Sequence, residues 1–243
     1  MCARRSSGSL PYAGTVEKAA LITGGTGGLG TAVIDAFLAD GWRVVAPVRG
    51  EDGGEAGRPG LEHVRADLLD AEQVAAAVDV AAAVEAAPLR AVVNLVGGFF
   101  DGPRVHELSL EDLERQLALN LRPTFLVTRA ALPPLLAAGG GAIVCVGSRA
   151  ALRPYRGAAA YATAKAAVIA FARAVAADYR DDGVRCNTVL PSVIDTPANR
   201  SAMPDADHEK WVKPEEIARV IRFLCSEESG ATNGAEIPVY GRA

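Results

Sequence analysis

The chain has 243 residues, of which 50% are hydrophobic and 22% are charged, and its formal net charge is −4 at pH 7. This composition excludes a disordered, fibrous or low-complexity protein and predicts one globular domain with an ample core. No stretch is basic enough to follow a nucleic-acid backbone or apolar enough to span a membrane, so we expect neither partner. The four cysteines are scattered without a CxxC pair, which predicts free thiols, no metal site and a cytoplasmic protein.

Short apolar segments alternate with longer Ala- and Leu-rich segments from residue 19 onward. The longer segments have helical periodicity, and two of them cover residues 109–138 and 158–177. This alternation is typical of the α/β class and predicts a Rossmann-type, doubly wound parallel β-sheet with helices on both faces. We expect a flexible segment over residues 1–14 and a single domain over residues 15–243. The predicted strands cover residues 19–23, 43–48, 63–66, 91–95, 142–146, 184–189 and 236–239.

Three helix starts are marked by local signals. Asp70 with Gln73, and Ser109 with Asp112, have the spacing of a capping box or come close to it. Pro214 suits the first position of a helix, where its missing N–H is not needed. Helices are therefore predicted to begin after residues 70 and 109 and at residue 214.

A glycine-rich segment, TGGTGGLG, covers residues 23–30, where the first predicted strand passes into the first helix. Glycines allow a tight turn and a close approach of the backbone to a pyrophosphate, which the helix N-terminus also attracts. The segment therefore predicts a dinucleotide site, as opposed to a turn without a ligand. Its candidate contacts are Thr23, Gly24, Thr26, Gly28, Leu29 and Gly30.

The residue that closes the second strand selects between NAD and NADP. Here the second predicted strand is followed directly by Arg49, whose guanidinium suits a 2′-phosphate and favours NADP(H). Glu51 and Asp52 come next and keep NAD(H) open, because an acid can bind a free ribose. Asp67 and Leu68 follow the third strand, where a carboxylate can accept a hydrogen bond from an adenine amino group.

Tyr161 and Lys165 are four residues apart in a predicted helix, so they lie on one face. A free phenol has a pKa of about 10, and a nearby ammonium group lowers it toward the working range of a general acid or base. Ser148 lies just past a predicted strand, at the sheet edge where ligands bind. Asn120 lies between two leucines in the preceding helix, and is either part of this site or a helix amide with satisfied hydrogen bonds.

These positions together resemble the short-chain dehydrogenase/reductase family over residues 19–241. The family's TGxxxGxG turn matches residues 23–30, and its serine followed thirteen residues later by YxxxK matches Ser148, Tyr161 and Lys165. Its catalytic asparagine matches Asn120. Two further motifs are imperfect: NNAG is NLVG at residues 94–97, and PGxxxT is PSVIDT at residues 191–196.

The resemblance implies an NAD(P)-dependent oxidoreductase that transfers hydride between a nicotinamide and a small-molecule carbonyl or alcohol. Tyr161 would be the general acid or base and Ser148 would hold the substrate oxygen. Lys165 would lower the pKa of Tyr161 and bind the nicotinamide ribose, and Asn120 would anchor a water molecule. The family also implies a homo-oligomer, a tetramer or dimer packed through helices 109–138 and 158–177. Its further cofactor contacts would be Asn94, Gly97, Tyr161, Lys165, Pro191, Ile194 and Thr196.

The substrate pocket should lie at the carboxyl ends of the strands, under a short lid over residues 199–211. Arg149, beside Ser148, would suit an acidic or phosphopantetheine-linked substrate. We expect an NADPH-dependent ketoreductase similar to 3-oxoacyl reductases. There are two alternatives. One is an enzyme of the dihydropteridine reductase type, because residues 195–204 and Trp211 resemble the corresponding stretch of those enzymes. The other is an NADP-binding module without catalysis. The candidate pocket residues are Phe99, Phe100, Arg149, Arg153, Tyr155 and Met203.

Overall fold

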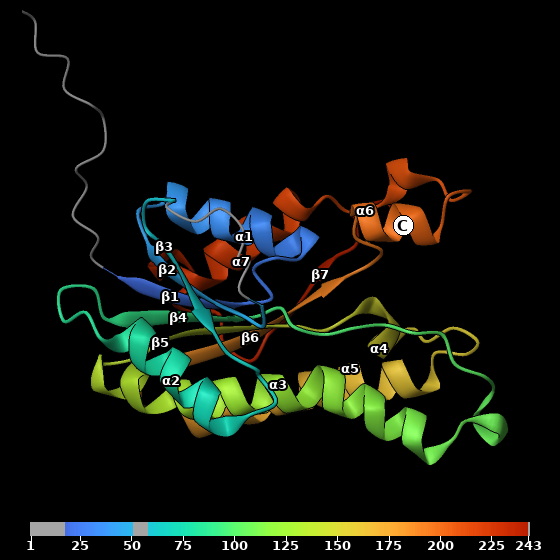
Figure 1. The fold of residues 1–243 in the computed structure, drawn as a ribbon, viewed down its shortest axis with the longest axis horizontal. Helices are drawn as coiled ribbons and strands as arrows, with labels where there is room; N and C mark the ends of the chain where they lie inside the picture. Colours follow the sequence, from blue (N-terminus) through green and yellow to red (C-terminus); the bar gives the residue numbers. More distant parts are fainter. Residues whose placement is uncertain (1–17, 51–57, 243) are drawn as a thin grey trace, which may run out of the picture.

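The computed structural model describes residues 18–50 and 58–242. Its seven strands form one parallel sheet with the order β3-β2-β1-β4-β5-β6-β7. Helices α1 and α7 cover one face, and α2, α3 and α5 cover the other (Figure 1). The predicted fold class, a Rossmann-type doubly wound sheet, is therefore confirmed.

The strands are β1 (Ala19–Thr23), β2 (Arg43–Val48), β3 (Leu61–Arg65), β4 (Leu89–Asn94), β5 (Gly141–Val146), β6 (Val184–Pro191) and β7 (Glu236–Val239). The helices are α1 (Gly28–Ala39), α2 (Ala71–Ala82), α3 (Leu110–Ala137), α4 (Arg149–Leu152), α5 (Ala159–Asp178), α6 (Pro197–Ala202) and α7 (Pro214–Cys225), with 3-10 turns η1 (Val105–Glu107), η2 (His208–Lys210) and η3 (Glu227–Ser229).

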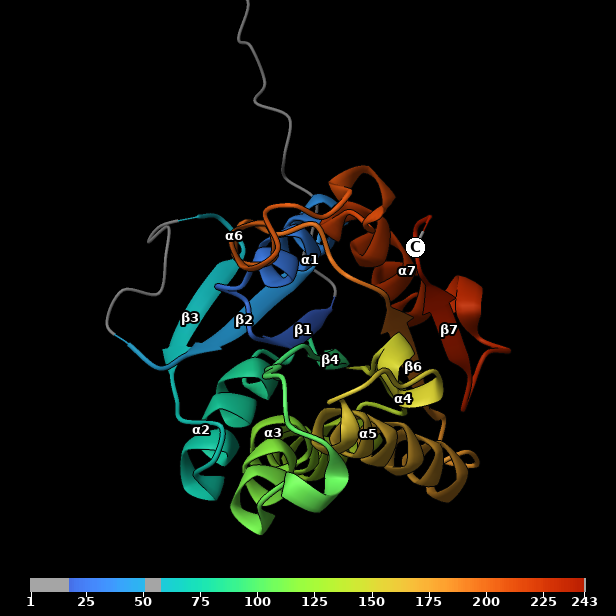
Figure 2. The ribbon, with the colours of Figure 1, turned by 90° about the vertical axis from the view of Figure 1, so that its right-hand side faces the viewer.

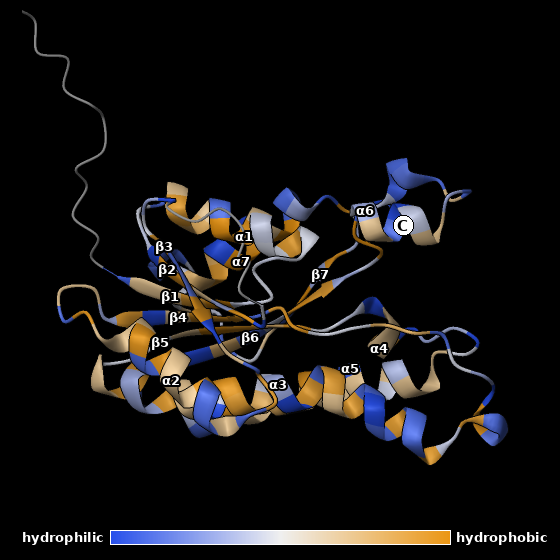
Figure 3. Cartoon of the chain, in the orientation of Figure 1, coloured by the Kyte–Doolittle hydropathy of each residue, from blue (hydrophilic) through white to orange (hydrophobic). Residues whose placement is uncertain are grey.

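The apolar runs of the central strands are continuous because both faces of the sheet are covered. One core cluster lies under α1 and α7 and includes Phe37, Trp42 and Ile217. A second lies under α2, α3 and α5 and includes Ile143 and Leu135. The hydropathy colouring shows the result, with apolar strands in the middle and polar stretches on the outer helices (Figure 3).

The three predicted helix starts are confirmed. The Asp70 carboxylate accepts hydrogen bonds from the N–H groups of Glu72 (2.9 Å) and Gln73 (3.2 Å). The Ser109 hydroxyl accepts one from the N–H of Asp112 (3.0 Å), and Pro214 opens α7. Local sequence therefore determines where these elements begin.

Two strands begin earlier than predicted. β3 begins at residue 61 and ends at residue 65, not 63–66, and β4 begins at residue 89, not 91. In both cases a charged residue interrupts the apolar pattern: Glu62 pairs with Arg43 at 2.6 Å, and Arg90 donates to the Ala138 carbonyl. Contacts with distant residues thus allow these strands to begin before the apolar pattern of the sequence does.

The order of the sheet reverses direction at β1, since the chain runs outward through β2 and β3 and then returns to β4 on the other side. β1 pairs with β2 only from Ala19 to Leu21, but with β4 as far as Thr23. Pro47 is tolerated inside β2 because it lies past the last β1–β2 pair. The strands therefore separate into a crevice at their carboxyl ends, the edge that faces the viewer in Figure 2.

Helix α5 is long and apolar enough, by length and composition, to cross a membrane. Half of that stretch is buried in the protein, which is the behaviour of a core helix. Cys145, Cys186 and Cys225 are buried free thiols, as predicted. The predicted flexible segment 1–14, Cys2, and the acids Glu51 and Asp52 lie outside the described residues.

Candidate active site

The glycine-rich turn joins β1 to the N-terminus of α1 at the crevice. Gly24 has φ of +70°, and the N–H of Gly27 donates to its carbonyl at 3.1 Å. A Cβ at Gly30 would overlap that same carbonyl, and one at Gly28 would lie 2.8 Å from the Thr196 methyl group. Only glycines fit at these positions, so the turn leaves an open strip of backbone that suits a pyrophosphate.

Thr23 and Asn94, two predicted cofactor contacts, lie behind the glycine-rich turn, outside the cavity lining. The Thr23 hydroxyl donates to the Val93 carbonyl (3.3 Å) and accepts from the N–H of Leu95 (3.1 Å). The Asn94 amide donates to Thr128, while its Oδ1 has no hydrogen-bond partner among the described residues. Both side chains are buried in the sheet edge. They shape the turn from behind and do not line the cavity.

Ser148 and Tyr161 bring two hydroxyl groups together. Ser148 follows β5 and caps α4, because its Oγ accepts from the N–H of Ala150 at 3.2 Å. Tyr161 lies in the first turn of α5. Burial raises the pKa of Tyr161, and the hydrogen bond with Ser148 acts in the opposite direction. The pair can hold an oxygen atom between a hydroxyl donor and a half-buried phenol.

Lys165 lies one turn further along α5 and is buried. Its Nζ donates to the Val146 carbonyl at 2.9 Å, and burial lowers its pKa to about 8. For Tyr161 burial of the phenol is the larger effect, so its pKa lies above the ordinary value. The phenol is consequently protonated near neutral pH.

Asn120 is fully buried in α3, and its side-chain amide is satisfied by protein groups. Nδ2 donates to the Gly98 carbonyl (3.0 Å) and to Gln116 Oε1 (2.8 Å), and Oδ1 accepts from the N–H of Gly98 (3.2 Å). A Cβ at Gly97 would lie 2.6 Å from Asn120 Oδ1 and 3.0 Å from Lys165 Nζ. The side chain therefore clamps the loop after β4 against the Lys165 ammonium group.

A cavity of about 870 Å³ is lined by Ser148, Tyr161 and Lys165 and opens along the crevice. It joins the glycine-rich turn to the Ser148 and Tyr161 hydroxyls, which is the arrangement expected of a cofactor cleft with an adjoining substrate pocket. The predicted site residues that line it are Gly24, Gly28, Leu29, Gly30, Gly97, Phe99, Ser148, Arg149, Arg153, Tyr155, Tyr161, Lys165, Pro191, Ile194 and Met203.

Other predicted cofactor contacts lie outside the lining. Thr26, Arg49 and Asp67 are exposed, the latter two where β2 and β3 end. Leu68 is part of the core under α2. Thr196 caps α6, since its Oγ1 accepts from the N–H of Asn199 at 3.2 Å.

Phe99 and Phe100 separate in the structure. Phe99 is 50% exposed, and its ring meets that of Tyr161 edge-on at a centroid distance of 5.0 Å. Phe100 turns toward α3, where the Arg115 guanidinium lies 4.1 Å from its ring centroid. Only Phe99 lines the cavity. An irregular loop has no helical or strand periodicity, so the sequence could not predict which of the two phenylalanines faces the cavity.

Sequence reasoning missed the polar lining residue Asp101, whereas Asn199 begins the predicted lid segment 199–211 and also lines the cavity. Asp101 follows the two phenylalanines on the loop after β4. The Asn199 side chain donates to the Ile194 carbonyl at 2.8 Å and so links α6 to the loop after β6. Asp101 lies on the loop that leaves the carboxyl end of β4, and that position was the available signal.

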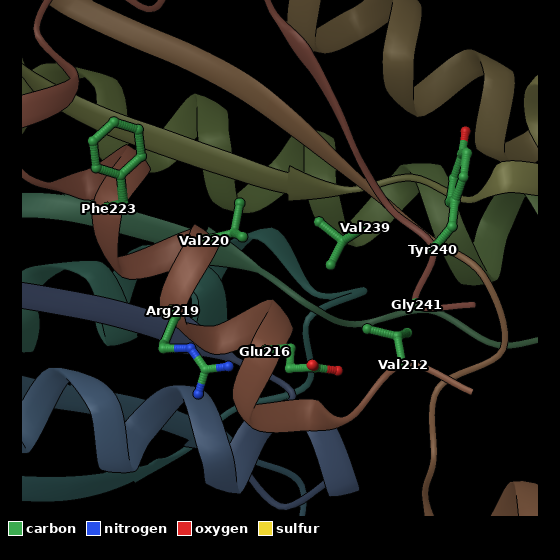
Figure 4. A pocket seen from close by; sticks show the side chains of 8 residues that line it. All are labelled: Val212, Glu216, Arg219, Val220, Phe223, Val239, Tyr240 and Gly241. Atoms are coloured by element: carbon green, nitrogen blue, oxygen red, sulfur yellow. The ribbon is translucent and has the colours of Figure 1, made fainter. Parts of the chain in front are cut away.

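A second hollow of about 490 Å³ lies between α7 and β7 (Figure 4). It is mainly apolar and shares no lining residue with the larger cavity. Its only charged side chains are Glu216 and Arg219, and no nucleophile faces it beyond the Tyr240 phenol. Within residues 18–50 and 58–242, no group of three or more His, Cys, Asp or Glu side chains could hold a metal ion. The chemistry therefore belongs to the larger cavity.

Residues 18–207 match the family model described as short chain dehydrogenase. The chain belongs to the short-chain dehydrogenase/reductase family. The chain is 35% identical to D-threitol dehydrogenase of Mycolicibacterium smegmatis, with 92% of each chain covered. It is 34% identical to mouse (3R)-3-hydroxyacyl-CoA dehydrogenase, with 91% of this chain and 94% of that protein covered. A short-chain dehydrogenase/reductase from Mycobacterium ulcerans superposes with a TM-score of 0.84 at 25% identity, covering 93% of this chain and 89% of that one.

Membership of this short-chain family establishes the broad chemistry. The protein is an oxidoreductase that acts on CH–OH or C=O groups of small molecules, and members of the family bind NAD(P). The expectation of such an enzyme is thus confirmed at this level.

Proposed function

We propose that this short-chain dehydrogenase/reductase is an NADPH-dependent ketoreductase in which Tyr161 supplies the proton. The single observation that carries the proposal is the half-buried Ser148–Tyr161 hydroxyl pair, which faces the same cavity as the glycine-rich turn. A raised pKa keeps the phenol protonated near neutral pH, so the resting protein is ready to act as an acid. A protonated phenol is the form that can deliver a proton to a carbonyl oxygen.

In this mechanism Ser148 Oγ donates a hydrogen bond to the carbonyl oxygen and orients it toward the phenol. Tyr161 then transfers its proton to that oxygen. The Lys165 ammonium, one helical turn from Tyr161 and held by the Val146 carbonyl, would stabilise the phenolate that remains. Asn120 acts as a positioning residue, because its amide holds the Gly97–Gly98 loop beside Lys165.

The cofactor would be NADP(H), which supplies or accepts the hydride when bound. The strip of open backbone at Gly24, Gly28 and Gly30 fits a pyrophosphate because a Cβ there would fill it or overlap the chain. The Arg49 guanidinium would bind the 2′-phosphate, and Asp67 with Leu68 would meet the adenine. Arg49 is exposed and has no ion-pair partner within the described residues.

Two features support a ketone substrate of the 3-oxoacyl type. The related mouse protein is named for a 3-hydroxyacyl-CoA, whose oxidised form is a 3-oxoacyl thioester. The cavity in this chain also has apolar side chains around the hydroxyl pair, including Phe99 and Met203. The buried free thiols support work in a reducing compartment, the cytoplasm.

The test is oxidation of NADPH and of NADH by the purified protein with ketones, β-ketoacyl thioesters, quinones and quinonoid dihydropterin. The account predicts turnover of a β-ketoacyl thioester or simple ketone, faster with NADPH. Turnover confined to quinonoid dihydropterin would assign the protein to the dihydropteridine reductase type instead. Cofactor binding without turnover of any compound would favour a binding module.

A further inference from the structure

Two arginines, one at the start of α4 and one directly after its end, lie at the substrate end of the cavity, next to the catalytic hydroxyls. Arg149 directly follows Ser148, and Arg153 is one turn further along the chain. Neither guanidinium has an ion-pair partner in the described part of the chain. Arg49 lies elsewhere, at the end of β2. The cavity thus has its own pair of free cations.

The Arg149 guanidinium is held in place by stacking. Its Cζ lies 5.2 Å from the ring centroid of Tyr240. The backbone of Tyr240 is itself fixed, because the Ser192 hydroxyl donates to its carbonyl at 2.6 Å. Stacking occupies a face of the planar guanidinium but leaves its N–H edge free for a bidentate acceptor. Arg149 is therefore oriented in advance and half-buried beside Ser148.

The cavity wall formed by the loop after β4 and by Tyr155 carries two large aromatic side chains. Phe99 and Tyr155 are each 50% exposed, and their ring centroids lie 6.4 Å apart. Met203 of the lid segment, also in the lining, is 38% exposed. Large apolar side chains left open around a cavity are typical of a surface that a ligand covers.

The charges of the cavity are separated between the two sides. Asp101 lies near Tyr155, since its negative charge adds to the effect of partial burial in raising the pKa of Tyr155 to about 12. Arg149 lies instead against Tyr240, near the end of β7. An anionic group would meet the arginines beside Ser148, and an apolar body would meet Phe99.

We propose that the natural substrate carries an oxyanion group, such as a carboxylate or phosphate, that pairs with Arg149 while an apolar, preferably planar body packs on Phe99. The inference rests on the proposed ketoreductase function and narrows its substrate class. Arg149 is then a specificity-determining residue, and Arg153, which is exposed, makes a smaller contribution.

The experiment compares 4-acetylbenzoate with its methyl ester and with 4-acetylphenyl phosphate, three ketones that differ in the group opposite the carbonyl. Binding to the NADPH-loaded protein is measured by calorimetry, alongside kcat/KM for NADPH oxidation. We expect the carboxylate to bind about ten- to hundredfold more tightly than the ester, the range for hydrogen bonds to charged groups. The phosphate arm shows which oxyanion fits better.

Variants separate the arginine from the rest of the pocket. Arg149→Gln should reduce the acid-to-ester ratio to near one, and Arg149→Lys should restore it in part. Arg156 is exposed, lies between α4 and α5, and does not line the cavity. The control variant Arg156→Gln should therefore keep the wild-type acid-to-ester ratio. Equal binding of acid and ester by the wild type, a ratio unchanged in Arg149→Gln, or no binding of any of the three would overturn the proposal. Preferential binding of the oxyanions without turnover would support the substrate class and count against the proposed reductase.

Discussion

At the residue scale, burial sets the charge of both catalytic groups on α5. It raises the pKa of the Tyr161 phenol and lowers that of the Lys165 ammonium to about 8. The sequence predicted their neighbourhood from the four-residue spacing, but not the sign of the shift at Tyr161. Spacing reports proximity, whereas desolvation depends on what the rest of the chain packs around the phenol. The Phe99 ring and α4 come from distant segments.

Lys165→Met tests the buried amine through stability. A lysine whose folded pKa is about 8 and whose ordinary value is 10.5 binds fewer protons when folded than when unfolded in that window. The buried amine thus destabilises the folded state by its full amount below pH 8, where it is charged in both states. This destabilisation decreases as the pH rises toward 10.5. From pH 7 to pH 9.5 the unfolding free energy of the wild type should rise by about 2 kcal/mol relative to Lys165→Met. Urea unfolding at the two pH values measures this, and parallel pH profiles would show that the amine has an ordinary pKa.

Arg49→Asp tests the choice of cofactor. Replacing a free guanidinium by a carboxylate at the end of β2 should weaken NADPH binding by about tenfold or more and favour NADH, as expected for loss of a charge-assisted contact to a phosphate. The two dissociation constants can be measured by quenching of Trp fluorescence. Arg180→Asp, an equally exposed change after the far end of α5, should leave their ratio unchanged. A constant ratio in Arg49→Asp would remove Arg49 from the cofactor site.

At the element scale, the loop after β4 depends on α3. Asn120 bonds both backbone groups of Gly98, so α3 fixes the loop that passes in front of Lys165. Gly97→Ala would put a methyl group within 3.0 Å of both Asn120 Oδ1 and Lys165 Nζ. We expect at least a tenfold loss in kcat/KM, because misplacement near 1 Å at a catalytic group is costly. Gly230→Ala, whose added Cβ meets only the Glu227 carbonyl, is the matched control. Full activity in Gly97→Ala would show that the loop can shift freely.

Elements with local signals were predictable. Asp70, Ser109 and Pro214 mark helix starts through their own hydrogen bonds or ring geometry, and the glycines at residues 23–30 mark the turn. The short helices α4 and α6 were not predicted. α4 has four residues and α6 has six, too few to show a periodic pattern. They form from tertiary context, which is why the orientation of Arg149 emerged only in three dimensions.

At the scale of the whole molecule, α3 and α5 present an aromatic pair, of which Phe125 is exposed and Phe171 is partly buried. Phe125 is 43% exposed, and its ring centroid lies 5.7 Å from that of Phe171. The predicted homo-oligomer would cover this face. Light scattering should give the wild type a multiple of the 25.1 kDa chain mass, and Phe125→Glu a smaller species. Val84→Glu, a similar change on the loop after α2, should keep the wild-type mass. A monomeric wild type, or equal masses for all three proteins, would contradict the prediction.

The central claim is that Tyr161 supplies the proton for hydride transfer, and Tyr161→Phe tests it most directly. This variant removes one oxygen atom and keeps the ring that packs against Phe99. We predict that turnover of the best ketone with NADPH falls by at least about a hundredfold, the usual contribution of a general acid. The dissociation constant for NADPH, measured on the same preparation, should change little. A variant that retains most of its rate would contradict the account and remove the tyrosine from the mechanism.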